Sequence, residues 1–99
     1  MAGFKQGDLI KIENRNDIFA VVSKDYFNKT GMAMLCPVMS DIFPDPLHIE
    51  IIYENMKWLV LCEHVKMYDL NCRGYSHLGE MTWTDRINVT DAIQSIFDY

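Results

Sequence analysis

The 99-residue sequence predicts one α+β domain, a small antiparallel β-barrel that carries a helix at its C-terminal end. Apolar runs of strand length recur along most of the chain, turn residues separate them, and the last segment has a helical apolar period. Apolar residues make up 49% of the sequence, enough for one buried core, and the length leaves no room for two domains. We therefore expect a single domain over residues 1–99.

Six short apolar runs are the expected strands. Polar residues 13–17 separate the first two runs, and their asparagines tolerate turn dihedrals, so these two strands should form an antiparallel hairpin. The runs cover residues 9–12, 19–23, 32–36, 48–52, 58–62 and 65–68.

Three connections have their own signatures. Residues 24–30 contain Asn28 and end at Gly31, which predicts a turn. Residues 41–46 hold two prolines, which exclude a central strand and predict a surface loop. Residues 69–74 are polar or small and end at Gly74, which predicts one short helical turn closed by that glycine.

The C-terminal segment predicts a helix of about three turns. Val89, Ile93, Ile96 and Phe97 recur at helical spacing and form one apolar stripe. Either Thr84 or Asn88 is expected to cap its first turn. Two tryptophans, at positions 58 and 83, are expected in the core or at a subunit contact.

Charge and cysteine content narrow the function. The formal net charge is −5, so binding to phosphates requires a local basic groove. Cys36, Cys62 and Cys72 lack the paired spacing of a zinc or redox site, which predicts reduced thiols. The sequence has no signal-peptide pattern and no apolar run of membrane-spanning length. We expect a cytoplasmic protein with no membrane partner and no cofactor.

The order of several short segments resembles the MazF/PemK-type toxins. The similar segments are residues 7–10, 20–23, 27–32, 36–40 and 60–66, followed by Asp69, Arg73 and Gly74. This resemblance implies an SH3-like barrel that forms a homodimer and holds single-stranded RNA in a groove. It also implies metal-independent RNA cleavage and an antitoxin whose disordered acidic tail occupies the same groove.

The sequence departs from the family where the chemistry is carried out. Asp17 and Ile18 stand where the family has an arginine-proline pair before the second strand. Leu61 and Glu63 stand where the PemK branch has an arginine and a catalytic aspartate, and only Ser40 keeps a hydroxyl where the family has a threonine pair or Thr-Ser. The usual cations are therefore missing, and cleavage is expected to be altered or lost.

The resemblance assigns roles to six residues. Glu63 would be the base and Ser40 would stabilise the phosphorane, while the substrate would be bound by Arg15, Asp17, His64 and Lys66. The acid and the positive charge would come from Arg15, His64 or Lys66. On a regular strand Glu63 and His64 face opposite sides, whereas His64 and Lys66 share one side. The alternative for that pair is an ordinary solvated surface, and for Ser40 a turn hydroxyl.

Two functions follow from these observations. The first is a MazF/PemK-like toxin-type protein with altered or lost endoribonuclease activity. The second is a non-catalytic module on the same barrel that grips an antitoxin-like peptide or a topoisomerase-type target, and the acidic composition favours it. Gyrase-poisoning relatives commonly end in Trp-Gly-Ile, and residues 96–99 of this chain lack that ending.

Overall fold

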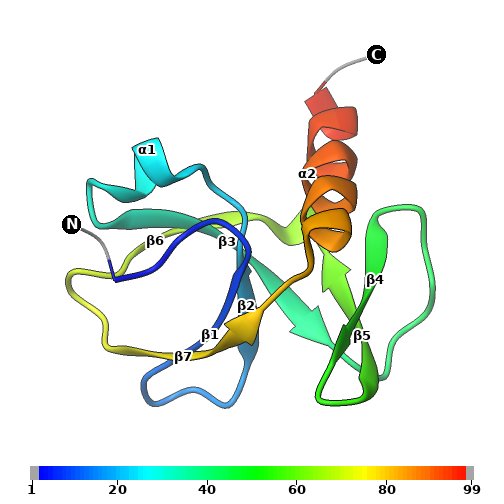
Figure 1. The fold of residues 1–99 in the computed structure, drawn as a ribbon, viewed down its shortest axis with the longest axis horizontal. Helices are drawn as coiled ribbons and strands as arrows, with labels where there is room; N and C mark the ends of the chain where they lie inside the picture. The colour runs from blue at the N-terminus through cyan, green and yellow to red at the C-terminus, as the bar shows by residue number, and fades with distance from the viewer. Residues whose placement is uncertain (1–2, 98–99) are drawn as a thin grey trace.

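The computed structural model describes residues 3–97, which form one antiparallel sheet and a long C-terminal helix (Figure 1). The α+β class predicted from the sequence is confirmed. In chain order the elements are β1 (Asp8–Ile12), β2 (Ile18–Val21), α1 (Asp25–Asn28), β3 (Met32–Met39), β4 (His48–Tyr53), β5 (Met56–Leu61), the 3₁₀ turn η1 (Cys62–His64), β6 (Lys66–Asp69), β7 (Tyr75–Glu80) and α2 (Trp83–Phe97).

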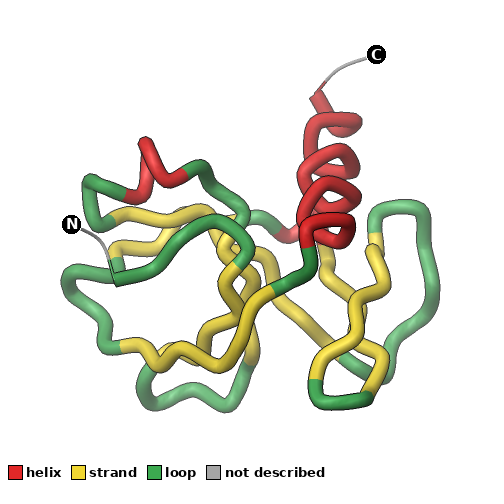
Figure 2. Tube along the Cα trace, in the orientation of Figure 1, coloured by secondary structure: helices red, strands yellow, loops and turns green. Residues whose placement is uncertain are grey.

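The sheet curls into a partly open barrel (Figure 2). Its strand order is β4-β5-β3-β2-β1-β7, and β6 pairs separately with β3. All the pairs are antiparallel, including the predicted hairpin of β1 and β2. Asn14 in that hairpin has a φ of 68°, a left-handed conformation that asparagine adopts more readily than most residues.

One edge of β3 pairs with two strands in succession. Val38 lies opposite Val60 of β5, and Leu35 lies opposite Lys66 of β6. Between these two pairs, β3 has two residues, Cys36 and Pro37, whereas the segment from β5 to β6 has five, residues 61–65. Three of those five residues form η1. This arrangement resembles a large β-bulge, a feature that redirects side chains. Pro37 lies at the interruption, where a residue without an N–H group does little harm to the ladder.

The central strands are buried on both faces because the sheet curls around them. In β1, Leu9 belongs to one core cluster and the adjacent Ile10 to the other. The first cluster lies under α2 and also contains Ala20, Val22, Cys36, Val38, Ile51, Val60, Cys62, Met81 and Val89. The second fills the barrel and also contains Phe4, Ile12, Phe19, Val21, Ala33, Leu35 and Leu70.

Strand β7 was not predicted, and the helical turn expected for residues 69–74 is wrong. Those residues form a non-helical turn, in which the Asn71 N–H donates to Asp69 Oδ1 at 3.0 Å. The Asn71 side chain also donates to Thr30 O at 3.1 Å. The second bond anchors this turn to the segment before β3, and the chain then continues into β7 beside β1.

Residues 24–30 contain a short helix, α1, where the sequence predicted only a turn. Asn28 is buried at its end, and its side-chain nitrogen donates to Ser23 O at 3.0 Å. This bond ties the last residue of α1 back to the end of the preceding segment. Gly31 follows with a φ of 87°, a conformation suited to glycine.

The C-terminal helix is confirmed, but its cap and its buried stripe differ from the prediction. The Thr82 hydroxyl accepts the Asp85 N–H at 3.1 Å, so Thr82 caps α2, not Thr84 or Asn88. Val89 is buried and Ile93 is half-buried, whereas Phe97 is 74% exposed because α2 extends beyond the sheet (Figure 1). Trp83 is also largely exposed and does not fill the core.

No helix within residues 3–97 combines the length and apolar character needed to cross a membrane.

Leu35 is the residue whose truncation should destabilise the barrel most clearly. Its side chain is fully buried in the second cluster, on the strand that pairs with both β2 and β6. Leu35→Ala should lower the free energy of unfolding by about 2–5 kcal/mol, measured by urea denaturation. Met67→Ala, on an exposed side chain of the neighbouring strand, should change it by less than about 0.5 kcal/mol. Equal effects of the two substitutions would contradict the assigned core.

Candidate nucleic-acid interface

A cavity of about 260 Å³ lies between the β1–β2 loop, β3, η1 and β6, and we call it the groove. Its polar lining consists of the four residues that the sequence predicted to bind the substrate: Arg15, Asp17, His64 and Lys66. Its apolar lining consists of Ile18, Phe19, Pro37, Val38, Met39 and Tyr68. The structure thus brings together residues that are about fifty positions apart in the sequence.

Arg15 and Asp17 reach the groove from the β1–β2 loop. Arg15 Nη2 donates to Asp17 Oδ2 at 3.0 Å, and both side chains are about half exposed. An ion pair this exposed adds little stability, but it offsets the negative charge of Asp17 at the groove wall. The Arg15 guanidinium also lies 5.4 Å from the centre of the Phe19 ring, a cation–π distance.

His64 and Lys66 enter the groove from the other side. His64 is the last residue of η1 and Lys66 is the first residue of β6, and both are exposed. The sequence predicted that they share one side of a regular strand. They do line the same cavity, although the 3₁₀ turn and not a continuous strand places them there.

Two aromatic rings lie between these basic side chains, the half-buried Tyr68 and the buried Phe19, which is 3% exposed. The Phe19 and Tyr68 rings are 5.4 Å apart and tilted by 54°. Arg73 lies 5.5 Å from the centre of the Tyr68 ring and adds a further positive charge beside the groove. Sequence analysis did not identify Phe19 or Arg73 as site residues. Cations beside an exposed π-face are the combination that binds single-stranded nucleic acids, and here Tyr68 is the ring that has such a face.

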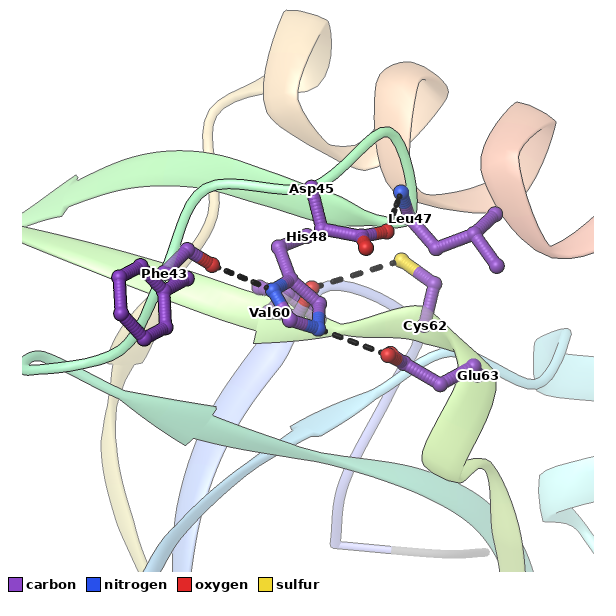
Figure 3. A network of polar contacts seen from close by, with 7 residues as sticks. All are labelled: Phe43, Asp45, Leu47, His48, Val60, Cys62 and Glu63. Carbon is purple, nitrogen blue, oxygen red and sulfur yellow. Dashed lines mark hydrogen bonds and ion pairs between the residues drawn. The ribbon is translucent and has the colours of Figure 1, made fainter.

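Glu63, the predicted base, points away from the groove. Its Oε2 is 2.7 Å from His48 Nε2, and His48 Nδ1 donates to Phe43 O at 2.8 Å (Figure 3). We call these three residues the His48 clamp, since they join the β3–β4 loop to η1. Ser40 lies outside the groove too, in an adjoining hollow of about 250 Å³ that also has Asp17 on its wall.

No model of a known protein family and no curated protein matches this sequence. The structure is similar to the MazE-MazF complex (Form-I) from Deinococcus radiodurans, with a TM-score of 0.85 and 21% identity over 97% of each chain. The chain has the MazF fold. The resemblance predicted from the sequence is thereby confirmed for the fold.

Two further solved structures agree with this assignment. An endoribonuclease in complex with its cognate antitoxin from a mycobacterial species gives a TM-score of 0.81 and 13% identity, covering 96% of this chain and 95% of that one. The Mycobacterium tuberculosis toxin MazF-mt6 gives 0.74 and 11% identity, covering 93% of this chain and 96% of that one. The MazF-like architecture therefore extends over nearly the whole chain.

The His48 clamp fixes the protonation of its histidine. Each ring nitrogen faces an oxygen acceptor, so both nitrogens must carry a proton to satisfy both contacts. The hydrogen bond to the Phe43 carbonyl and then the Glu63 carboxylate raise the pKa of His48. Below the raised pKa of His48, the clamp is an imidazolium–carboxylate pair.

Within residues 3–97, a group of three side chains that could hold a metal ion lies in and beside the clamp. One ligand atom each from Asp45, His48 and Glu63 lies within 4.8 Å of the others. All three already take part in hydrogen bonds, since Asp45 Oδ1 accepts the Leu47 N–H at 2.9 Å. A bound metal ion would have to replace the proton shared by His48 and Glu63.

Two buried cysteines take no part in the chemistry of the site. Burial raises the pKa of Cys36 to about 12 and that of Cys62 to about 11. Both stay protonated at neutral pH, and a thiol is a poor nucleophile and a poor metal ligand. Cys36, Cys62 and Cys72 are all free.

The clamp makes stability depend on pH with a defined sign. Because the pKa of His48 is raised, its contribution is fully present below the unfolded-state value of about 6.5 and is lost as pH rises through the folded-state value. The difference in unfolding free energy between the wild type and His48→Gln, from urea denaturation at several pH values, should shrink as pH rises through that window.

The matched control is Glu50→Gln, which removes an exposed carboxylate from the same strand without touching the clamp. It should leave the pH dependence unchanged, whereas Glu63→Gln should weaken it. A difference between the wild type and His48→Gln that is constant or grows with pH would refute the clamp.

Proposed function

We propose that this chain is a MazF-like toxin-type protein that binds single-stranded RNA in its groove. The observation that carries the proposal is the groove itself, in which Arg15, His64 and Lys66 lie around the half-buried Tyr68 ring, with the buried Phe19 ring beside it. Lysine and arginine side chains bind the phosphates, and the Tyr68 ring can stack on a base. The MazF fold adds support, since solved structures of that fold include an endoribonuclease with its cognate antitoxin.

Cleavage in this groove would follow an altered scheme. RNA cleavage without a metal needs a base for the ribose 2′-hydroxyl, an acid for the leaving oxygen and positive charge at the phosphorane. Within the groove His64 is suited to the proton transfers, and Lys66 and Arg15 to the charge. Glu63 would have to leave His48 to act as the base, and Ser40 would act from the adjoining hollow.

The proposal includes partners and location. An antitoxin with a disordered acidic tail would compete with RNA, because its carboxylates would meet the same groove cations. A homodimer is supported by the exposed apolar side chains of α2, including Trp83, Ile87 and Phe97, which are unusual on a free surface. We place the protein in the cytoplasm, where its three thiols remain reduced.

A second function is supported by two observations on charge. The carboxylate of Asp17 stands on the groove wall, and Glu63 is held by His48. Both features weaken catalysis, and the net charge of −5 disfavours binding to a long polyanion. The rival is a non-catalytic module that uses the barrel to grip a protein, either an antitoxin-like peptide or a topoisomerase-type target.

RNA cleavage separates the two functions. Purified protein incubated with mixed-sequence RNA and a chelator should release fragments with 2′,3′-cyclic phosphate ends. His64→Gln should slow their release by about 10²–10⁴-fold, the usual contribution of a general acid or base. Such ends would reject the non-catalytic module, whereas RNA that stays intact with the wild type would show that cleavage is lost. An unchanged rate in His64→Gln would reject the role of His64.

Binding of RNA tests the groove independently of cleavage. Lys66→Ala should reduce the slope of log Kd against log salt concentration by roughly 0.7, the value for one lost phosphate contact on a single strand. Lys57→Ala, an exposed lysine on β5 that does not line the groove, should leave the slope unchanged. Equal slopes for the two variants would place the RNA elsewhere.

A further inference from the structure

A second cavity, of about 270 Å³, lies between the N-terminal segment, β1 and β7, and we call it the Asp8 cavity. Its lining residues are Gly3, Phe4, Lys5, Asp8, His77 and Glu80. None of these lines the groove, and none has a role in the proposed RNA chemistry. The cavity is therefore a separate feature, and its ligand chemistry is independent of the proposed function.

Asp8 is a buried carboxylate with one oxygen left unsatisfied. Its side chain is only 3% exposed. Oδ2 accepts the Lys5 N–H at 2.9 Å, whereas Oδ1 has no hydrogen-bond partner among residues 3–97. A buried charged oxygen without a donor is costly, so such atoms usually have a partner in the working protein.

The neighbouring side chains do not supply that donor. His77 Nε2 is 3.5 Å from Oδ1, too far for a good hydrogen bond. Lys5 is engaged elsewhere, since its Nζ lies 3.1 Å from Glu80 Oε1. Arg86 stacks over Trp83 and forms no ion pair with Asp8 within 4.0 Å. His77 forms an ion pair with Asp8 only when it is protonated, and none of these side chains gives Oδ1 a hydrogen-bond donor.

A β-bulge gives the cavity its shape. Leu9 pairs with Gly79 and Ile10 pairs with His77, so Leu78 is an extra residue in β7. Bulges of this kind re-aim neighbouring side chains and often occur beside functional sites. Here the bulge brings the half-exposed His77 ring to the edge of the cavity, with buried Asp8 behind it.

We propose that the Asp8 cavity binds a primary ammonium group, carried by a free amine or by a lysine side chain of a partner polypeptide. The ammonium would donate to Asp8 Oδ1 and neutralise its charge, and a neutral His77 would offer Nε2 as a second acceptor. The buried Phe4 ring supplies an apolar wall for the methylene groups of the ligand.

The arrangement discriminates against a guanidinium group. An arginine forms its strongest contact when two carboxylate oxygens accept in parallel, and at Asp8 the second oxygen is occupied by the Lys5 N–H. Only one oxygen is free, which suits a compact ammonium. Amines should therefore bind more tightly than guanidines of the same length.

The test is an NMR titration of the full chain in phosphate buffer, with methylammonium, butylammonium, butylguanidinium and N-acetyl-lysine methylamide as probes. Saturable shifts are expected for the backbone amides of Lys5, Asp8 and His77, with butylammonium binding more tightly than butylguanidinium. Asp8→Asn should weaken amine binding by about tenfold or more, since it removes a charged hydrogen bond. Asp41→Asn, at an exposed carboxylate in the β3–β4 loop, should leave it unchanged.

The probes also separate the two sources of the ligand. If the lysine derivative binds more tightly than butylammonium, the cavity accepts a side chain of a partner, and the reverse order assigns it to free amines. His77→Gln provides a second test should Asp8→Asn fail to fold, and it should weaken amine binding by a few-fold. No saturable shift in the wild type, or equal binding by Asp41→Asn and Asp8→Asn, would overturn the proposal. Neither result bears on RNA binding in the groove.

Discussion

The break in strand pairing along one edge of β3 determines where Glu63, His64 and Lys66 lie. Along one edge of β3, β5 ends at Leu61 and β6 begins at Lys66, and η1 takes up the residues that have no partner. A continuous strand would alternate its side chains between two faces. The 3₁₀ turn instead sends Glu63 toward His48 and leaves His64 at the groove. The base inferred by resemblance and the groove cations are thereby separated.

Because Glu63 is held by His48 outside the groove, the groove can carry positive charge although the whole chain is acidic. The net charge of −5 is spread over the molecule, whereas Lys66, His64 and Arg15 converge on one cavity. Asp17 stands among them and pairs with Arg15 at 3.0 Å, so the positive charge that this pair leaves uncompensated is that of Lys66. Local charge, more than the total, decides whether a groove attracts a phosphate, since screening limits the reach of exposed charges to about 8–10 Å.

The sequence predicted the strands and the helix that a short stretch of neighbouring residues is enough to identify. Each of the six apolar runs corresponds to one strand, β1 to β6, because strand length and apolar content are local properties of the sequence. Strand β7 escaped prediction because Ser76, His77, Gly79 and Glu80 break any apolar pattern, and the pairing with β1 alone makes it a strand. Thr82 was missed as the helix cap because Thr84 and Asn88 are also capping residue types, and the apolar stripe used to place the helix begins only at Val89.

The site was predictable only in part, for a similar reason. Arg15, Asp17, His64 and Lys66 could be named because each has a polar side chain in a segment that resembles the toxins. The place of Phe19 depends on its register opposite Pro37, and this long-range pairing cannot be read from one strand. The orientation of Glu63 depends on a 3₁₀ turn that the apolar pattern does not encode.

The central claim is that the interrupted strand builds an RNA groove from His64 and Lys66 against Phe19 and Tyr68. The most direct measurement is NMR mapping of a single-stranded oligonucleotide, with 2′-O-methyl riboses so that it is not cleaved. The account predicts saturable shifts at these four residues and at Arg73, and none in the β4–β5 hairpin turn. Shifts confined to α2 or β4, with the groove residues unchanged, would contradict it.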